Sequence, residues 1–194
     1  MNALSGIPIA WMVARGAGLV AFGFLTLSVW LGLAMSTRLL ASRHGKRLLG
    51  LHQSLAWMGL SALALHAGAL LVDPTIGFGP AALLVPFAAP WHPVAVAGGV
   101  IAGWLMLMLT VSFKFRKRIG QKTWRKLHFA SFAAFVLAML HAITAGTDLA
   151  GIGGPILALV AGTPVLWLTL VRILSPRGVP RRAAPSPTLS SRSI

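Results

Sequence analysis

Residues 51–71 read LHQSLAWMGLSALALHAGALL, and this stretch decides the fold of the chain. It is apolar over roughly the 20 residues that a helix needs to cross a bilayer. It also places His52 and His66 fourteen residues apart, one near each end of the stretch. Ionisable side chains are costly at membrane depth, so histidines within such a helix are candidates for function.

A second stretch repeats this arrangement. Residues 124–144, WRKLHFASFAAFVLAMLHAIT, are again long and apolar enough to span a membrane. His128 and His141 lie thirteen residues apart, near the two ends of the apolar run. Two such helices side by side would bring their histidines to two matching depths.

The composition of the whole chain is typical of a membrane protein. Of its 194 residues, 57% are hydrophobic and only 10% are charged, whereas a soluble domain is about a quarter charged. We therefore predict an all-α membrane protein, a bundle of about five transmembrane helices within residues 1–174. Residues 175–194 are rich in Pro, Ser and Arg and predict a disordered cytoplasmic tail. The five predicted spans cover residues 11–35, 49–72, 93–113, 124–146 and 152–174.

The charges predict the orientation. Seventeen Lys and Arg against two acidic residues give a net charge of +15, which in a soluble protein would suggest nucleic acid. Sixteen of these bases lie in residues 36–48, in 114–126 and from Arg172 onward, whereas the other loops carry only Asp73 and Asp148. Cytoplasmic loops of membrane proteins are rich in Lys and Arg. We expect the N-terminus outside, the C-terminus in the cytoplasm, and the bases near anionic lipid rather than nucleic acid.

Two further segments bear on this topology. The first apolar run lacks a basic region ahead of it and is too long for a cleavable signal peptide, so we expect a retained helix. The segment at 73–93, DPTIGFGPAALLVPFAAPWHP, is apolar but broken by Pro and Gly. We expect it to form an interfacial or re-entrant cap at the outer end of the bundle.

The topology makes the two histidine helices parallel. His52 and His128 then lie near the inner surface, and His66 and His141 lie near the outer one, about 20 Å away at 1.5 Å per residue. Depth matching of this kind is what bis-histidine haem ligation requires. We predict one haem between His52 and His128 and a second haem between His66 and His141.

The directions in which the histidines point around each helix axis match less well than their depths. A spacing of fourteen residues leaves two side chains only about 40° apart on an α-helix, but thirteen residues leave about 140°. The second helix therefore needs local 3₁₀ tightening, or a helix crossing, to present both of its histidines to one partner.

Composition also restricts the ligand chemistry. The chain has no cysteine, which excludes thiolate metal sites, iron–sulfur clusters and covalent c-type haem. A proton relay or a divalent-metal pathway would need carboxylates, and neither acidic residue lies in a predicted span. A single histidine could simply hydrogen-bond a neighbouring helix. Four histidines paired by depth favour haem.

Other polar residues lie close to the predicted sites. Arg15, near the outer end of the first span, either snorkels to the headgroups or pairs with a propionate of the outer haem. Arg125 is a candidate for the inner propionates. His92, beside Trp91, is expected at the membrane interface or near the outer haem edge, and His44 is expected to be solvated.

These stretches resemble the ferric-reductase-like transmembrane domain family. That family includes the haem domains of NADPH oxidases and ferric reductases, and the membrane haem subunit of the periplasmic methionine sulfoxide reductase system. The resemblance covers residues 11 to about 146, and the histidine spacings match the family pattern. It implies two b-type haems, or at least one, that carry electrons from the inner to the outer face. It rests on ARGAGLVAFGFLTLSVWLG at 14–32, FKFRKRIGQKTWRKLH at 113–128, and the two histidine pairs.

The chain also departs from that family. Members often have six helices, and the oxidases and reductases carry a flavin and nicotinamide domain after them. Here about twenty residues follow the last predicted span, without a Gly-rich dinucleotide fingerprint. We expect a membrane haem subunit of an oxidoreductase, multi-pass in the plasma (inner) membrane of a prokaryote. Its donor would be a separate flavoprotein or quinol, and its acceptor would lie on the outer face.

Two other functions remain open from the sequence. One is a cytochrome b561-like quinol oxidoreductase subunit, which also holds two haems between helices. The other is a non-redox membrane scaffold or transporter, which would hold no haem and would tolerate changes at the histidines.

Overall fold

The computed structural model describes residues 9–37, 45–74, 77–149 and 151–174, and within them the fold is all helical. The expected tail at 175–194 and His44 lie outside the described residues. Five helical segments are long and apolar enough to cross a membrane, as predicted. They are α1 (Ile9–Ser36), α2 (Gly45–Val72), α4 (Pro93–Ile119), the pair α5 (Gln121–His128) and α6 (Ala130–Ala145), and α7 (Gly153–Leu174).

The helix ends have local causes. α4 begins at Pro93, where the missing amide proton has no cost in a first helical turn. It continues six residues beyond the predicted span and ends at Gly120, whose φ of 88° is readily adopted only without a side chain. The chain turns there into α5, which has no buried residue.

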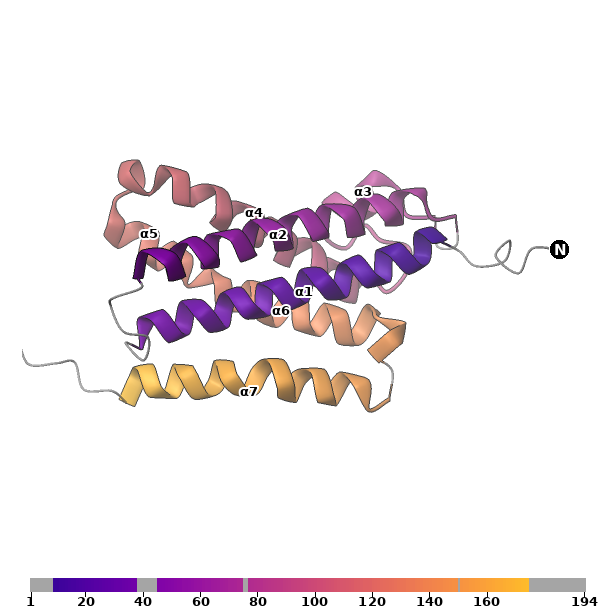
Figure 1. Ribbon diagram of the computed structural model, residues 1–194. Helices are drawn as coiled ribbons and strands as arrows, with labels where there is room; N and C mark the ends of the chain where they lie inside the picture. The colour runs from indigo at the N-terminus through magenta and orange to yellow at the C-terminus, as the bar shows by residue number, and fades with distance from the viewer. Residues whose placement is uncertain (1–8, 38–44, 75–76, 150, 175–194) are drawn as a thin grey trace, which may run out of the picture.

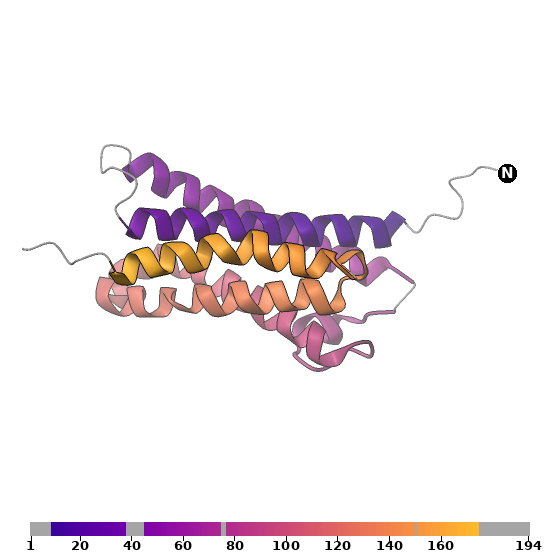
Figure 2. The same ribbon diagram turned by 90° about the horizontal axis from the view of Figure 1, so that it is seen from below.

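Figure 1 shows the helices running along one common direction, with α1 beside α2 and α7 at the edge of the bundle. The view in Figure 2 shows α1, α7 and α6 side by side, in agreement with the contacts between these three helices. Phe22 of α1 stacks on Phe135 of α6, with 5.8 Å between ring centroids. The Trp30 indole donates to the Ala161 carbonyl of α7 at 3.1 Å. This core joins α1, α6 and α7 tightly.

The rest of the bundle is packed less completely. α1 has eight buried residues, whereas α2 has only Gly59 and Ala69. α2 packs closely along α1 and α4 packs closely along α6, but α2 and α4 touch over a shorter stretch. A seam therefore runs between α2 and the α4–α6 pair.

One end of the bundle is covered by a short cap. The segment from Gly77 folds through α3 (Pro80–Leu84) back onto α4, and Phe78, Ala82 and Ala89 are buried there. The Trp104 indole of α4 donates to the Leu84 carbonyl at 2.9 Å. We call this the cap end; it also holds the start of α1 and the short 3₁₀ helix η2 (Thr147–Leu149). The segment does not span, as its Pro and Gly content predicted.

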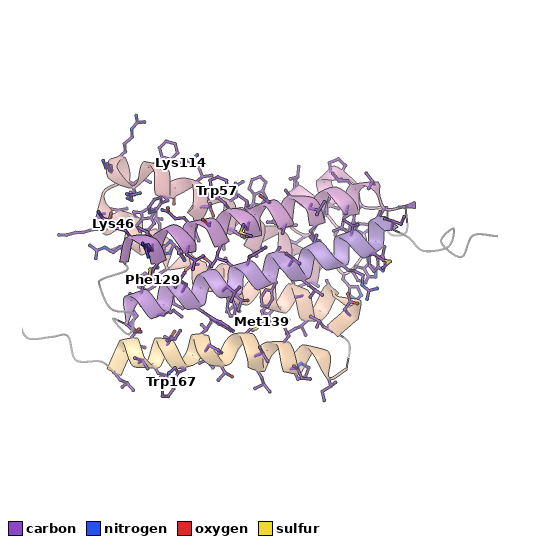
Figure 3. The ribbon with its side chains drawn as sticks, viewed as in Figure 1. Lys46, Trp57, Lys114, Phe129, Met139 and Trp167 are labelled. Atoms are coloured by element: carbon purple, nitrogen blue, oxygen red, sulfur yellow. The ribbon has the colours of Figure 1, made fainter. Side chains whose placement is uncertain are left out.

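The opposite end carries the positive charge. We call it the basic end. Figure 3 shows Lys46, at the start of α2, and Lys114, near the end of α4, close to this end of the bundle. Among the described residues, every Lys and Arg except Arg15 belongs to this end. They are Lys46, Arg47, Lys114, Arg116, Lys117, Arg118, Lys122, Arg125, Lys126 and Arg172.

Candidate functional site

The structure brings the four histidines together in two pairs across the seam. The ring centroids of His52 on α2 and His128 at the end of α5 lie 6.0 Å apart, with the ring planes at 71°. The centroids of His66 on α2 and His141 on α6 lie 6.3 Å apart, with the planes at 78°. These are the pairs that depth matching predicted. The first lies toward the basic end and the second toward the cap end.

The irregularity expected in the second histidine helix is present. α5 ends at His128, and α6 begins two residues later. The Phe129 amide donates to the Lys126 carbonyl at 3.1 Å, and the Phe132 amide donates to the Phe129 carbonyl at 3.1 Å. Both bonds join residues three apart, which is the 3₁₀ pattern. Local tightening, one of the two expected adjustments, is therefore present beside His128.

Three of the four imidazoles are held by backbone carbonyls. Nδ1 of His66 donates to the Ala14 carbonyl at 2.7 Å. Nδ1 of His52 donates to the Ser28 carbonyl at 2.9 Å, and Nδ1 of His141 donates to the Ala95 carbonyl at 2.9 Å. A carbonyl can only accept, so these rings carry their proton on Nδ1 and leave Nε2 as the nitrogen available to a metal.

His128 is held differently. Its ring stacks on the Trp124 indole at 4.9 Å between centroids, with 24° between the planes. Its Nδ1 is buried, and within the described part of the chain it has no hydrogen-bond partner. Sequence reasoning did not single out Trp124 as a neighbour of the histidine, although a spacing of four residues on one helix predicts such a contact.

A cavity of about 500 Å³ adjoins the His66–His141 pair. His66 and His141 line it, together with mostly apolar side chains of α1, α2, α4 and α6, and Trp91 of the cap. Its volume is in the range of small-molecule and cofactor pockets, roughly 300–1,000 Å³. His52 and His128 do not line this cavity.

Arg15 and Asp148 lie at the wall of the same cavity. The Arg15 guanidinium forms a hydrogen-bonded ion pair with the Asp148 carboxylate of η2. It also lies 5.7 Å from the centroid of the Trp11 ring. Arg15 therefore faces the site, and it has a protein partner that sequence reasoning missed. The only clue was that Asp148 is the acidic residue that follows the fourth span.

The other candidates are less closely placed. Arg125 is exposed, and its Nε donates at 3.5 Å to the Gln121 carbonyl of its own helix. His92 is exposed at the N-terminus of α4, in the left-handed conformation with φ of 43°. Its ring meets Trp91 edge-on at 4.2 Å, so it lies beside a residue of the cavity wall.

The fold and the paired imidazoles define a class: a helical membrane protein with two cross-helix histidine pairs. Comparison of the chain with models of known families, with curated proteins and with solved structures finds no match. The residues that the structure describes contain no cluster of three or more His, Asp or Glu able to hold a metal ion.

Proposed function

We propose that the protein is a dihaem b-type membrane cytochrome that carries electrons across the membrane. The separation of the paired imidazoles is the observation that carries this proposal. An iron atom bound by two imidazole nitrogens at about 2 Å each, the usual metal–nitrogen distance, holds the ring centres roughly 6 Å apart. The measured separations are 6.0 and 6.3 Å.

The number and chemistry of the ligands agree with haem. Each pair offers two nitrogens, and a porphyrin would supply the other four. The chain has no cysteine, so the attachment would be non-covalent. The Nδ1 bonds of His52, His66 and His141 leave Nε2 for the metal, which is the usual support of a ligating histidine.

The incomplete packing of α2 also supports the proposal. α2 has only two buried residues, and part of its surface lines the cavity. The cavity beside His66 and His141 lies on this seam. Close packing is the rule in protein interiors, and a flat apolar macrocycle would restore it.

We place the basic end in the cytoplasm and the N-terminus outside, in the plasma (inner) membrane, because basic residues favour the cytoplasmic side. When bound, haem supplies one-electron redox chemistry, and the protein supplies ligation, burial and local charge. His52 and His128 would hold the inner haem, near the donor. His66 and His141 would hold the outer haem, with Arg15 beside it and the acceptor on the outer face.

The donor is a flavoprotein or membrane quinol. A soluble flavoprotein would approach the exposed bases of α5, so its electron transfer should slow steeply with ionic strength. Reduction of the haems by a quinol within the bilayer should depend little on salt. The rate of haem reduction by each donor, measured by stopped flow, distinguishes the two possibilities. Reduction by quinol would indicate a cytochrome b561-like protein, and reduction by a flavoprotein would indicate the other.

The proposal is tested by a reduced-minus-oxidised visible spectrum and a pyridine haemochrome count on the purified full chain. Two low-spin b haems per chain are expected. His66→Ala or His141→Ala should remove the outer haem and about half of the absorbance, because either change removes one of the two imidazoles that would hold that haem. His92→Ala is the matched control and should keep both haems. A colourless protein after expression with sufficient haem would overturn the proposal. So would unchanged haem absorbance in both His66→Ala and His141→Ala.

A further inference from the structure

Three of the four imidazoles contact a neighbouring helix in the same way, through one backbone carbonyl and one glycine. In each case Nδ1 donates to the carbonyl of one residue, and the ring then lies against a glycine four residues later on the same helix. The carbonyl and glycine residues are Ser28 and Gly32 for His52, Ala14 and Gly18 for His66, and Ala95 and Gly99 for His141.

The glycine has a physical reason. On an α-helix, a side chain leans toward the N-terminus and covers the turn before it, which includes the carbonyl four residues earlier. Without a side chain, that carbonyl can accept a second hydrogen bond from outside the helix. A Cβ on Gly18 would lie 2.9 Å from His66 Nδ1, and a Cβ on Gly99 would lie 2.7 Å from His141 Nδ1. Gly32 is less tight, at 3.3 Å from His52 Cε1.

The spacing of these features follows the spacing of the histidines. Gly18 and Gly32 are fourteen residues apart on α1, as are His52 and His66 on the antiparallel α2. On α4, the residue thirteen positions after Gly99 is Ser112, and His128 precedes His141 by the same thirteen. The position that would receive His128 in this register is therefore occupied by a serine.

Ser112 has other partners. Its hydroxyl donates to the Leu109 carbonyl at 2.9 Å and accepts from the Trp124 indole at 3.2 Å. Trp124 in turn stacks on His128. His128 is thus the histidine that faces a serine instead of a glycine. It is also the one whose buried Nδ1 has no hydrogen-bond partner among the described residues.

We infer that each of these pairs of a carbonyl and the glycine four residues later, which we call a carbonyl–glycine step, is a positioning element. The three steps set the tautomer and the direction of His52, His66 and His141. Because Ser112 occupies the fourth glycine position, His128 is the one imidazole of the four that is oriented by stacking alone. The consequence at the haems rests on the proposed function. A hydrogen bond from Nδ1–H makes a ligating imidazole more basic and so favours the oxidised iron. The outer site has two such ligands, and the inner site has one.

Haem content tests the steps themselves. Gly18→Ala and Gly99→Ala should each displace a histidine ring and remove the outer haem from the full chain. Their controls are Gly16→Ala, where the added Cβ meets nothing within 4 Å, and Gly98→Ala, where its nearest contact is an ordinary 3.5 Å. Both controls should keep two haems per chain. Equal haem content in Gly99→Ala and Gly98→Ala would overturn the inference.

The inner site is tested by Ser112→Gly, which opens the Met108 carbonyl to His128. In a spectroscopic redox titration, one of the two haem components should move to a lower midpoint potential, and the other should stay unchanged. Ser112→Ala, which keeps a side chain over that carbonyl, should not lower either potential. No shift in Ser112→Gly, or the same downward shift in Ser112→Ala, would contradict the role of the glycine position.

A readout without haem separates the two proposals. Histidine ¹⁵N spectra of the full chain in detergent should show the Nδ1–H tautomer for His66 and His141. Gly18→Ala should abolish it for His66 and Gly99→Ala for His141, while Gly16→Ala and Gly98→Ala should preserve both. If the chain binds no haem but shows this pattern, the function fails and the positioning holds. If the glycine variants leave the tautomers unchanged, the positioning fails, whatever the haem content.

Discussion

Arg15 is the residue at which the charge pattern and the site meet. It is the one described base at the cap end, and it lies with its partner Asp148 in the wall of the cavity beside His66 and His141. Its ion pair is partly exposed, with 36% and 34% of the two side chains accessible. An exposed pair of this kind contributes only about 0–1 kcal/mol to stability, so its use is better sought in the local charge of the outer site.

We predict opposite effects from the two halves of this pair. Arg15→Gln leaves Asp148 unbalanced and should lower the midpoint potential of the outer haem, because a negative charge favours the oxidised iron. Asp148→Asn should raise it, and each shift should be of the order of 1 kcal/mol, since solvent screens the pair. Redox titration of both variants and of the double variant, expected near the wild type, measures this. Unchanged potentials in both single variants would show that Arg15 serves only the membrane interface.

At the scale of the element, the decisive feature is the junction between α5 and α6. A continuous α-helix would place His128 and His141 about 140° apart, and the two 3₁₀-type bonds at Phe129 and Phe132 lie in the interval where a change of phase is needed. The junction also leaves α5 at the basic end with all of its residues unburied.

A one-residue insertion tests this phase. One alanine inserted after Ala133 should turn His141 by about 100° and move it by about 1.5 Å relative to His128. His128 and His141 can then no longer face His52 and His66 at the same time, so we expect one haem per chain to be lost. An alanine inserted after Thr144, beyond both histidines on the same helix, is the control and should keep two haems. Two haems in the first variant would show that the junction absorbs changes of phase.

At the scale of the whole molecule, the charges and the odd number of spans predict the orientation in the membrane. The described chain begins at the cap end and finishes at the basic end (Figure 1). The two described acidic residues, Asp73 and Asp148, lie toward the cap end, and ten of the eleven described bases lie at the basic end. Apolar side chains such as Trp167 of α7 point away from the bundle (Figure 3), as expected of a surface in contact with lipid.

The absence of cysteine makes the orientation directly measurable. A cysteine at Ile152, which is 76% exposed between η2 and α7, should react with a membrane-impermeant maleimide on intact cells or spheroplasts. A cysteine at the exposed Lys122 of α5 should react only after the membrane is opened. The reverse pattern would invert the orientation and, with it, the assignment of the inner and outer pairs.

The sequence by itself determined the helical class, the five spans and the pairing of the histidines. Span length and apolar content are set by the bilayer, and depth along a helix follows from a constant rise per residue. Span length and depth can each be calculated from a single segment. Histidines at equal calculated depths on the two helices are therefore the ones that the structure brings together. The spacing of thirteen residues also predicted local tightening or a helix crossing in the second histidine helix, but it did not distinguish between them.

Only the tertiary structure decided which groups surround the histidines. The carbonyls of Ala14 and Ala95, the ion pair of Arg15 with Asp148, and the isolation of His128 Nδ1 all depend on the register between helices far apart in the chain. Register is set by the mutual fit of small and large side chains, such as Gly18 against His66. No single segment contains that information, because each contact is the joint property of two surfaces.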